Sequence, residues 1–191
     1  MVDKWDTGYG YDINSMAKDG VQVPPDENKE VSFSTVSYIY DTTLPTSRVN
    51  LPVNNSWRNT LTLITGTAND PTIVSGGRPA NIDRVEISLQ RHSDGYWWYG
   101  SSFSVGGTSW LSTTLTEYAP TSWTWTYSML DSYWTDNTSY TIVCRAFDRA
   151  SNLAWGTSNY FIFDTSSPVS IVTAGIGQPP EQTLGPPGYP V

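Results

Sequence analysis

Apolar and polar residues alternate in several short runs of the chain, and helix-like spacing is rare. The segment 85–89 (Val-Glu-Ile-Ser-Leu) alternates strictly, as in a strand with one buried face. In 123–127 aromatic residues alternate with threonine, and both types favour sheets. The predicted strands cover 47–51, 61–68, 85–89, 96–99, 123–127, 140–147 and 159–163. Turn-forming residues separate them, so the pattern predicts an all-β fold and favours a β-sandwich.

The chain also repeats part of itself at a constant spacing. Trp5, Tyr11, Ile13, Ala17 and Asp19 recur as Trp134, Tyr140, Ile142, Ala146 and Asp148. The segment 38–45 (Tyr-Ile-Tyr-Asp-Thr-Thr-Leu-Pro) returns as 161–168 (Phe-Ile-Phe-Asp-Thr-Ser-Ser-Pro), and the first copy carries a longer loop at 21–29. Such out-of-phase recurrence indicates a window on a tandem array.

The repeat predicts the domain organisation. Residues 1–40 correspond to the last two strands of a preceding unit, and residues 41–163 to one complete unit. Residues 164–191 contain the junction, the start of another unit and a tail rich in Pro and Gly from 175 onward.

Composition narrows the function classes. The formal net charge is −8 with ten Lys and Arg, so a nucleic-acid partner is not expected. No apolar stretch approaches the length of a membrane span, so membrane insertion is not expected either. The one cysteine, Cys144, is interpreted as a small strand residue, and the one histidine, His92, as a residue of the turn 91–95. Nothing in the sequence singles out a catalytic group, so we expect a protein that is not an enzyme.

Several motifs together resemble a known family. The run 145–152 (Arg-Ala-Phe-Asp-Arg-Ala-Ser-Asn), the junction 163–165 (Phe-Asp-Thr) with Pro168, and the early 66–68 (Gly-Thr-Ala) are similar to bacterial immunoglobulin-like (Big-type) tandem repeat domains of large surface or extracellular proteins. The resemblance implies an immunoglobulin-like β-sandwich and an extracellular or cell-surface location. Ser151 departs from the Gly that the family prefers at its position.

The resemblance also implies calcium. In related repeats, aspartates near a domain boundary hold a calcium ion that stiffens the linker, and calcium takes six to eight oxygen ligands. Carried over by position, Asp148, Asn152 and Asp164 would contribute at one junction, and Asp19 and Asp41 at the other. The alternative is that these residues only cap turns through their own backbone.

The tryptophans suggest a different hypothesis, because exposed indoles can stack on sugar rings. Trp97, Trp110 and Trp155 are the candidates for binding a surface glycan. Against this, Trp5 and Trp134 occupy equivalent positions in the repeat, and an aromatic residue repeated at a fixed place usually packs.

Three functions follow from these patterns. The first is a structural spacer or adhesive segment, with neighbouring repeats as partners. The second is a filament in which residues 1–40 complete an identical subunit by strand exchange. The third is a carbohydrate-binding module.

Overall fold

The computed structural model describes residues 5–20, 29–72 and 74–171, whose regular elements are strands apart from one short 3₁₀ turn. The all-β prediction is therefore confirmed. No helix in this described part of the chain has the length and apolar character needed to cross a membrane. The tail 175–191 and most of the loop 21–29 lie outside the described residues.

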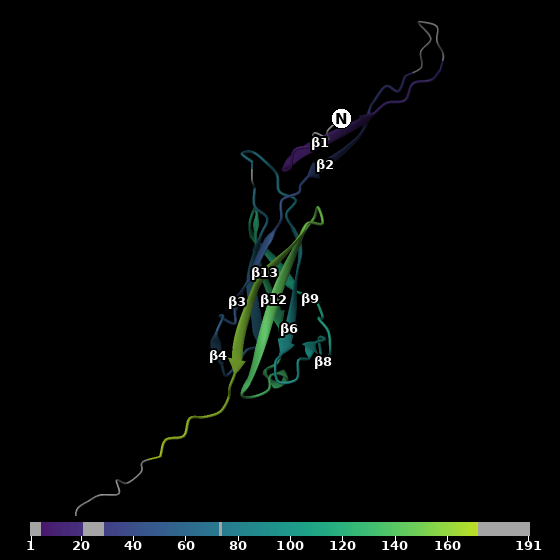
Figure 1. Ribbon diagram of the computed structural model, residues 1–191. Helices are drawn as coiled ribbons and strands as arrows, with labels where there is room; N and C mark the ends of the chain where they lie inside the picture. Colours follow the sequence, from purple (N-terminus) through teal and green to yellow (C-terminus); the bar gives the residue numbers. More distant parts are fainter. Residues whose placement is uncertain (1–4, 21–28, 73, 172–191) are drawn as a thin grey trace, which may run out of the picture.

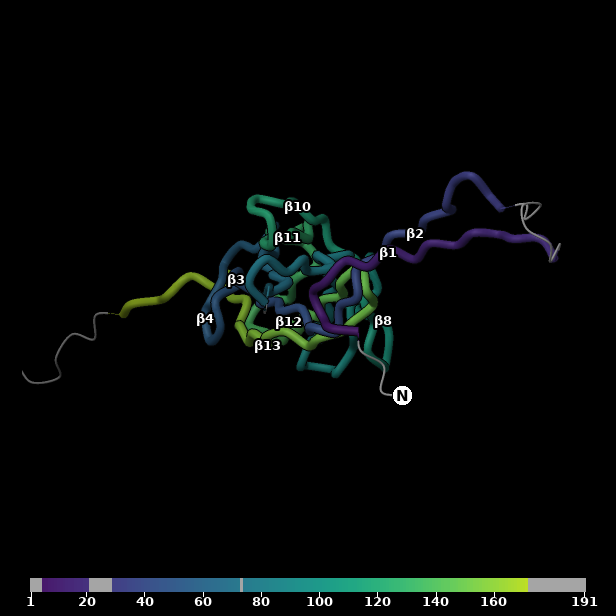
Figure 2. The backbone as a smooth tube through the Cα atoms, turned by 90° about the horizontal axis from the view of Figure 1, so that it is seen from above, coloured from purple at the N-terminus to yellow at the C-terminus, as the bar shows by residue number. Residues whose placement is uncertain are grey.

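Two sheets enclose the main core (Figures 1 and 2). The four-stranded sheet has the order β10-β11-β5-β3, with β3 (Thr46–Leu51), β5 (Leu63–Asn69), β10 (Thr114–Ala119) and β11 (Ser122–Ser128). The seven-stranded sheet follows the order β4-β13-β12-β6-β7-β8, and β9 also pairs with β6. Its strands are β4 (Ser56–Arg58), β6 (Ile82–Arg91), β7 (Trp97–Trp98), β8 (Phe103–Val105), β9 (Leu111–Ser112), β12 (Thr138–Asp148) and β13 (Leu153–Phe163). All described pairings are antiparallel except that of β4 with β13.

The core follows from the alternation of side chains along each strand. Every second residue of β12 is buried, from Thr138 to Asp148. Trp123 and Trp125 of β11 share the buried face, as the alternation predicts. The 3₁₀ turn η1 (Asp131–Tyr133) then leads into Trp134, whose indole is also buried. Aromatic rings therefore fill much of the space between the sheets.

Gly66 in the Gly-Thr-Ala motif allows this aromatic packing. A Cβ added at Gly66 would overlap both the Trp125 ring and the Arg48 carbonyl oxygen. Because no side chain fits there, the glycine lets the indole of β11 lie directly across β5.

The predicted strands largely agree with those observed. The predicted ranges overlap β3, β5, β6, β7, β11, β12 and β13. The ladder between β12 and β13 continues past an irregularity near Val143, so β13 begins at Leu153 rather than at Asn159 as predicted. The prediction missed β4, β8, β9 and β10, none of which lies in a predicted range.

A separate hairpin projects beyond one end of the sandwich. Strand β1 (Tyr9–Ser15) pairs antiparallel with β2 (Ser34–Tyr40). Figure 1 shows this hairpin extending away from the sandwich, whereas residues 164–171 leave from the opposite end. The backbone therefore enters and leaves the sandwich at opposite ends.

The hairpin reproduces the local structure of the β12–β13 ladder. One aromatic trio is Trp5, Tyr11 and Tyr38 in the hairpin, and the other is Trp134, Tyr140 and Phe161 in the sandwich. In each trio the indole meets the tyrosine ring edge-on, with ring centroids 4.5 Å and 4.9 Å apart. The ring across the strand pair stacks on the same tyrosine at 5.7 Å and 5.4 Å. The sequence repeat is therefore also a structural repeat.

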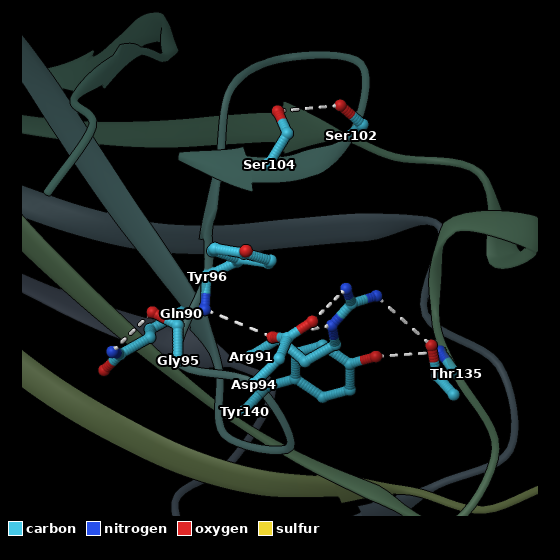
Figure 3. A network of polar contacts seen from close by, with 9 residues as sticks. All are labelled: Gln90, Arg91, Asp94, Gly95, Tyr96, Ser102, Ser104, Thr135 and Tyr140. Atoms are coloured by element: carbon cyan, nitrogen blue, oxygen red, sulfur yellow. Dashed lines mark hydrogen bonds and ion pairs between the residues drawn. The ribbon is translucent and has the colours of Figure 1, made fainter. Parts of the chain in front are cut away.

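Both tyrosines close the same kind of corner. The Tyr140 hydroxyl accepts a hydrogen bond from the backbone N–H of Thr135 at 2.7 Å (Figure 3). The Tyr11 hydroxyl accepts one from the N–H of Asp6, also at 2.7 Å. Each bond ties the start of a strand to the segment five residues upstream.

Candidate metal centre

Three aspartates meet where the hairpin joins the sandwich. Asp41 follows β2, Asp70 follows β5, and Asp148 ends β12. All three side chains are buried, and one carboxylate oxygen from each lies within 4.8 Å of the other two. Segments far apart in the sequence therefore build one group of carboxylates, which we name the aspartate cluster.

Asp41 links the hairpin to the sandwich. Its Oδ1 accepts hydrogen bonds from Thr43 N at 2.8 Å and Thr7 Oγ1 at 3.1 Å, and its Oδ2 accepts one from Ala80 N at 2.7 Å. Its carbonyl oxygen accepts a bond from Asn152 Nδ2 at 3.0 Å. Burial raises the pKa of Asp41, but the hydrogen bonds to its carboxylate outweigh burial and hold the pKa below its usual value.

Asp148 is held by the tight turn between β12 and β13. Asn152 donates its backbone N–H to Asp148 Oδ1 at 2.8 Å and its side-chain Nδ2 to Oδ2 at 2.7 Å. Ser151 in this turn has a φ of 71°, in the left-handed region that glycine adopts without strain. Glycine would therefore be less strained than serine at position 151, and glycine is the residue that the similar repeat domains prefer there.

Asp70 is the least satisfied member of the cluster. Its Oδ2 accepts a hydrogen bond from Asn81 N at 2.6 Å, whereas its buried Oδ1 has no hydrogen-bond partner. Burial first, and then the negative charge of Asp41 and Asp148, raises the pKa of Asp70 to about 6, although the bond from Asn81 N lowers it. The side-chain Oδ1 of Asn81 is likewise buried without a partner.

No ion pair found among the described residues joins the aspartate cluster to a basic side chain. Carboxylates this close repel one another unless one holds a proton or a cation lies between them. Carboxylate and amide oxygens are the ligands of hard divalent cations. The buried cluster could therefore hold a metal ion.

The structure regroups the predicted ligands. Asp148 and Asn152 were grouped with Asp164, but Asp164 follows Phe163 at the other end of the ladder, where Thr138 pairs with Phe163. Asp19, which was grouped with Asp41, is exposed beyond the far end of the hairpin. The structure brings neither of these groupings together, because an antiparallel hairpin places its two aspartates a strand length apart. The cluster instead joins Asp41, which follows the hairpin, to Asp70 and Asp148 of the sandwich.

Two residues of the site were missed by the sequence analysis. Asp70 and Asn81 lie between the predicted strands 61–68 and 85–89, where the sequence analysis named no site residue. The partial first copy has no counterpart of this region, so the repeat gave no signal for either residue. The available clue was Asp70 directly after a β-rich run and before Pro71, a composition shared by ordinary turns.

The glycan candidates divide into a pair and a separate residue. Trp110 and Trp155 contact each other edge-on at 5.3 Å, and the Arg145 guanidinium lies 4.0 Å from the Trp110 ring centre. Trp155 is 64% exposed. Trp97 lies apart on β7, where it pairs with Gln90.

The one cysteine and the one histidine of the chain both form hydrogen bonds to neighbouring strands. Cys144 is buried in β12, its Sγ accepts a hydrogen bond from Ser47 Oγ at 3.4 Å, and burial raises the pKa of its thiol. His92 follows β6 and forms a hydrogen bond to Thr141 Oγ1 at 2.8 Å. In the adjoining turn, Asp94 forms an ion pair with Arg91 at 2.6 Å (Figure 3).

Comparisons with known proteins give little further guidance. No protein-family model matches the chain, and no curated protein matches it significantly. The chain is similar to one chain of a solved structure described as the structural basis of T cell specificity and activation by the bacterial superantigen toxic shock syndrome toxin-1. That similarity has a TM-score of 0.29 and 12% identity, and it covers 62% of this chain and 98% of the other. It is too distant to assign a family.

Proposed function

We propose that this chain is a non-enzymatic spacer module of an extracellular or cell-surface repeat protein, with junctions stiffened by calcium. The observation that carries the proposal is the buried aspartate cluster, with the unpartnered Asp70 Oδ1, at the point where one repeat unit meets the next. Neighbouring repeats are its partners.

An immunoglobulin-like topology fits the observed strand order. The sheet β10-β11-β5-β3 and the ladder β13-β12-β6 correspond to the two sheets of such a sandwich, with β3 as the first strand and β13 as the last. A tyrosine near the start of the sixth strand, bonded to the backbone a few residues upstream, is typical of this architecture, and Tyr140 has that position. The motifs that resemble bacterial immunoglobulin-like repeats point to the same fold.

Calcium suits the cluster better than a smaller cation. Calcium accepts six to eight oxygens in flexible geometry, whereas magnesium demands a near-ideal octahedron. Asp41, Asp70 and Asp148 supply carboxylates from three separate segments. Asn81, whose backbone N–H contacts Asp70, also has a buried side-chain oxygen without a partner. A bound cation would offset the repulsion that raises the pKa of Asp70.

The mechanical effect follows from which segments the cluster joins. Asp41 lies between hairpin and sandwich and accepts hydrogen bonds from Thr7 of the hairpin side and Ala80 of the sandwich. The backbone of Arg78 also donates to Gly8 O at 2.7 Å. A cation held by Asp41, Asp70 and Asp148 would connect the same two bodies and restrict bending between them.

The direct test measures the spread of hairpin orientations. Spin labels are placed on Ser15→Cys at the far end of β1 and Ser158→Cys on β13, both exposed sites, while the native Cys144 is buried. Pulsed electron resonance then gives the label-to-label distance distribution with chelator and with millimolar calcium. We expect calcium to narrow the distribution.

A matched pair of variants identifies the site. Asp70→Asn removes one carboxylate of the cluster, and Asp83→Asn removes an exposed carboxylate on β6. We expect the narrowing to disappear in the first variant and to persist in the second. An equal width with and without calcium in the unmodified chain would contradict the proposal.

One arrangement supports a second candidate, carbohydrate binding. Trp155 presents an exposed indole beside Trp110, and Arg145 in the same row forms an ion pair with Glu86 at 2.6 Å. An indole face next to charged groups is suited to a sugar ring and its hydroxyls. Glycan-array binding that is lost in Trp155→Ala and kept in Trp57→Ala, an equally exposed indole on β4, would support this function. An array without any binding would argue against it.

A further inference from the structure

The hairpin has one apolar face and one polar face. The apolar face is formed by Tyr9, Tyr11 and Ile13 of β1 with Val36, Tyr38 and Tyr40 of β2, joined by Trp5. On the other face, Thr35 Oγ1 donates to Asn14 Oδ1 at 2.7 Å and Ser37 Oγ donates to Asp12 Oδ1 at 2.5 Å. This separation is typical of a sheet with one face against a core.

The equivalent face of the β12–β13 ladder is buried. Trp134 is 6% exposed and Ile142 is 0% exposed, whereas Trp5 is 45% exposed and Ile13 is 53% exposed. The Trp, Tyr and Ile positions, the strand register and the ring geometry match, although Val36 corresponds to the polar Asn159 and Tyr9 to Thr138. The main difference between the two ladders is therefore what covers them.

The sandwich shows what covers such a ladder. The indole N–H of Trp134 donates to the carbonyl oxygen of Leu61 at 2.8 Å, just before β5. Phe103 packs against Trp134 and Tyr140, with ring centroids 6.3 Å and 5.4 Å away. In addition, β6 pairs with the edge of β12 that faces away from β13, and β4 pairs with the edge of β13 that faces away from β12.

The hairpin has no such cover among the described residues. There, β1 and β2 pair only with each other, and the four-stranded sheet that could cover them already covers β12 and β13. The Tyr11 corner nevertheless has the form that Tyr140 takes inside a complete sandwich. A two-stranded ladder with an apolar face is marginal in water.

We infer that residues 5–40 are the closing pair of strands of a second sandwich, and that their apolar face binds the remaining strands of that sandwich. The occupant is an antiparallel β-sheet with a Trp- and Ile-rich inner face, like that of β5 and β11. It also provides an edge strand for β1 and a backbone carbonyl for the Trp5 indole. It is polypeptide joined to the N-terminal side of Trp5 in the same protein. The inference rests on the proposed repeat organisation.

The size of the face favours this tethered occupant over a second copy. Seven-residue strands are about 23 Å long, and two paired strands are about 10 Å wide. The projected area of the apolar face, its length times its width, is therefore roughly 230 Å². A stable complex between separate proteins buries about 800 Å² on each partner. A covalently joined segment needs less area because its effective concentration reaches the millimolar range.

The test supplies an occupant of the stated chemistry. Residues 41–133 of this chain are fused directly to Trp5 of the chain 5–191, because Trp5 is the counterpart of Trp134. Hydrogen exchange then follows the backbone amides of β1 and β2. We expect them to exchange at least about 100-fold more slowly in the fusion than in the chain alone, as strands of a cooperative unit do. The indole N–H of Trp5, which NMR can follow separately from the other tryptophans, should become protected from exchange as well.

The control fusion carries Ile64→Asp in the added copy only, since Ile64 is fully buried in the core that covers the ladder. It should leave β1 and β2 as fast to exchange as in the chain alone. Unchanged exchange in a first fusion whose added strands are themselves protected would overturn the inference.

The unfused chain gives a second, independent test. A monomer over the micromolar range, in which the indole N–H of Trp5 exchanges rapidly with solvent, is the expected result. A dimer in which Trp5 is protected would identify a second copy as the occupant and overturn the inference. The calcium test of the proposed function measures the distance distribution between labels on the hairpin and on the sandwich in the unfused chain. The calcium effect and the protection of β1 and β2 in the fusion can therefore each fail without the other.

Discussion

Replacing Asp70 by asparagine should make the metal-free protein more stable at neutral pH. Asp70 Oδ1 is buried without a partner, and its pKa of about 6 lies above the value of 3.8 for a free carboxyl group. The folded state therefore retains a proton that the unfolded chain releases between about pH 4 and pH 6, so stability falls as pH rises through that window. The Asp70→Asn variant carries no charge at this position and would escape this loss.

The magnitude follows from the difference between the two pKa values. It corresponds to about 3 kcal/mol at most, and solvent near the end of the sandwich screens part of it, so we expect about 1 to 2 kcal/mol. For a domain of this size the melting temperature should rise on the order of 5 °C. Calcium should reduce this difference between the two chains. At ten times its dissociation constant it should stabilise the unmodified chain by about 1.4 kcal/mol and stabilise Asp70→Asn little.

Thermal unfolding followed by circular dichroism measures both effects, at about pH 5 and at neutral pH, with chelator and with calcium. Asp83→Asn is the control, because it changes the charge equally at an exposed site and should stay within about 0.5 kcal/mol of the unmodified chain. Two results would refute the reasoning. One is an Asp70→Asn variant that is less stable in chelator, and the other is an equal calcium effect in both chains.

Three further predictions concern packing and acid stability. In urea titrations, Trp134→Ala should lower the free energy of unfolding by about 3 to 5 kcal/mol and Trp5→Ala by under about 1 kcal/mol, because Trp134 is buried and Trp5 is exposed. Equal losses would contradict this difference in burial. Gly66→Ala should cost about 3 kcal/mol in the same assay because its Cβ would overlap the Trp125 ring, and a neutral effect would refute that packing. Stability should fall as pH drops below about 4, because Asp41 then loses a negative charge that the folded state favours. Melting temperatures measured against pH should decline less steeply in Asp41→Asn than in the unmodified chain. An equally steep decline in both chains would show that other groups cause the loss of stability.

The sequence was sufficient for the fold where local patterns carry the information. Strict alternation located β6, β11 and β12, because a strand with one buried face imposes it residue by residue. It failed for β10, whose Thr114–Ala119 run lies at a sheet edge with most side chains exposed. Burial does not impose a pattern on such a strand, so its sequence resembles a loop.

The candidate site was only partly predictable. Asp41, Asp148 and Asn152 were named because the repeat and the resemblance mark the ends of units. The structure groups Asp41 with Asp148 instead, because the aspartates that were predicted to lie together are separated by the length of a strand. Asp70 was missed because it reaches the cluster from the end of β5, and that proximity depends on how the two sheets align.

The two ends of the sandwich can be compared at Asp41 and Asp164. Asp164 repeats the local structure of Asp41: its Oδ1 accepts a hydrogen bond from Ser166 N at 2.9 Å, as Asp41 Oδ1 does from Thr43 N at 2.8 Å. At Asp41, the oxygens of Asp70 and Asp148 come from the sandwich that follows it in the chain. The aspartate cluster therefore connects the segment after the hairpin to the sandwich. If the proposed function holds, calcium would act on the angle between successive units, and its effect on the interior of a single sandwich would be small.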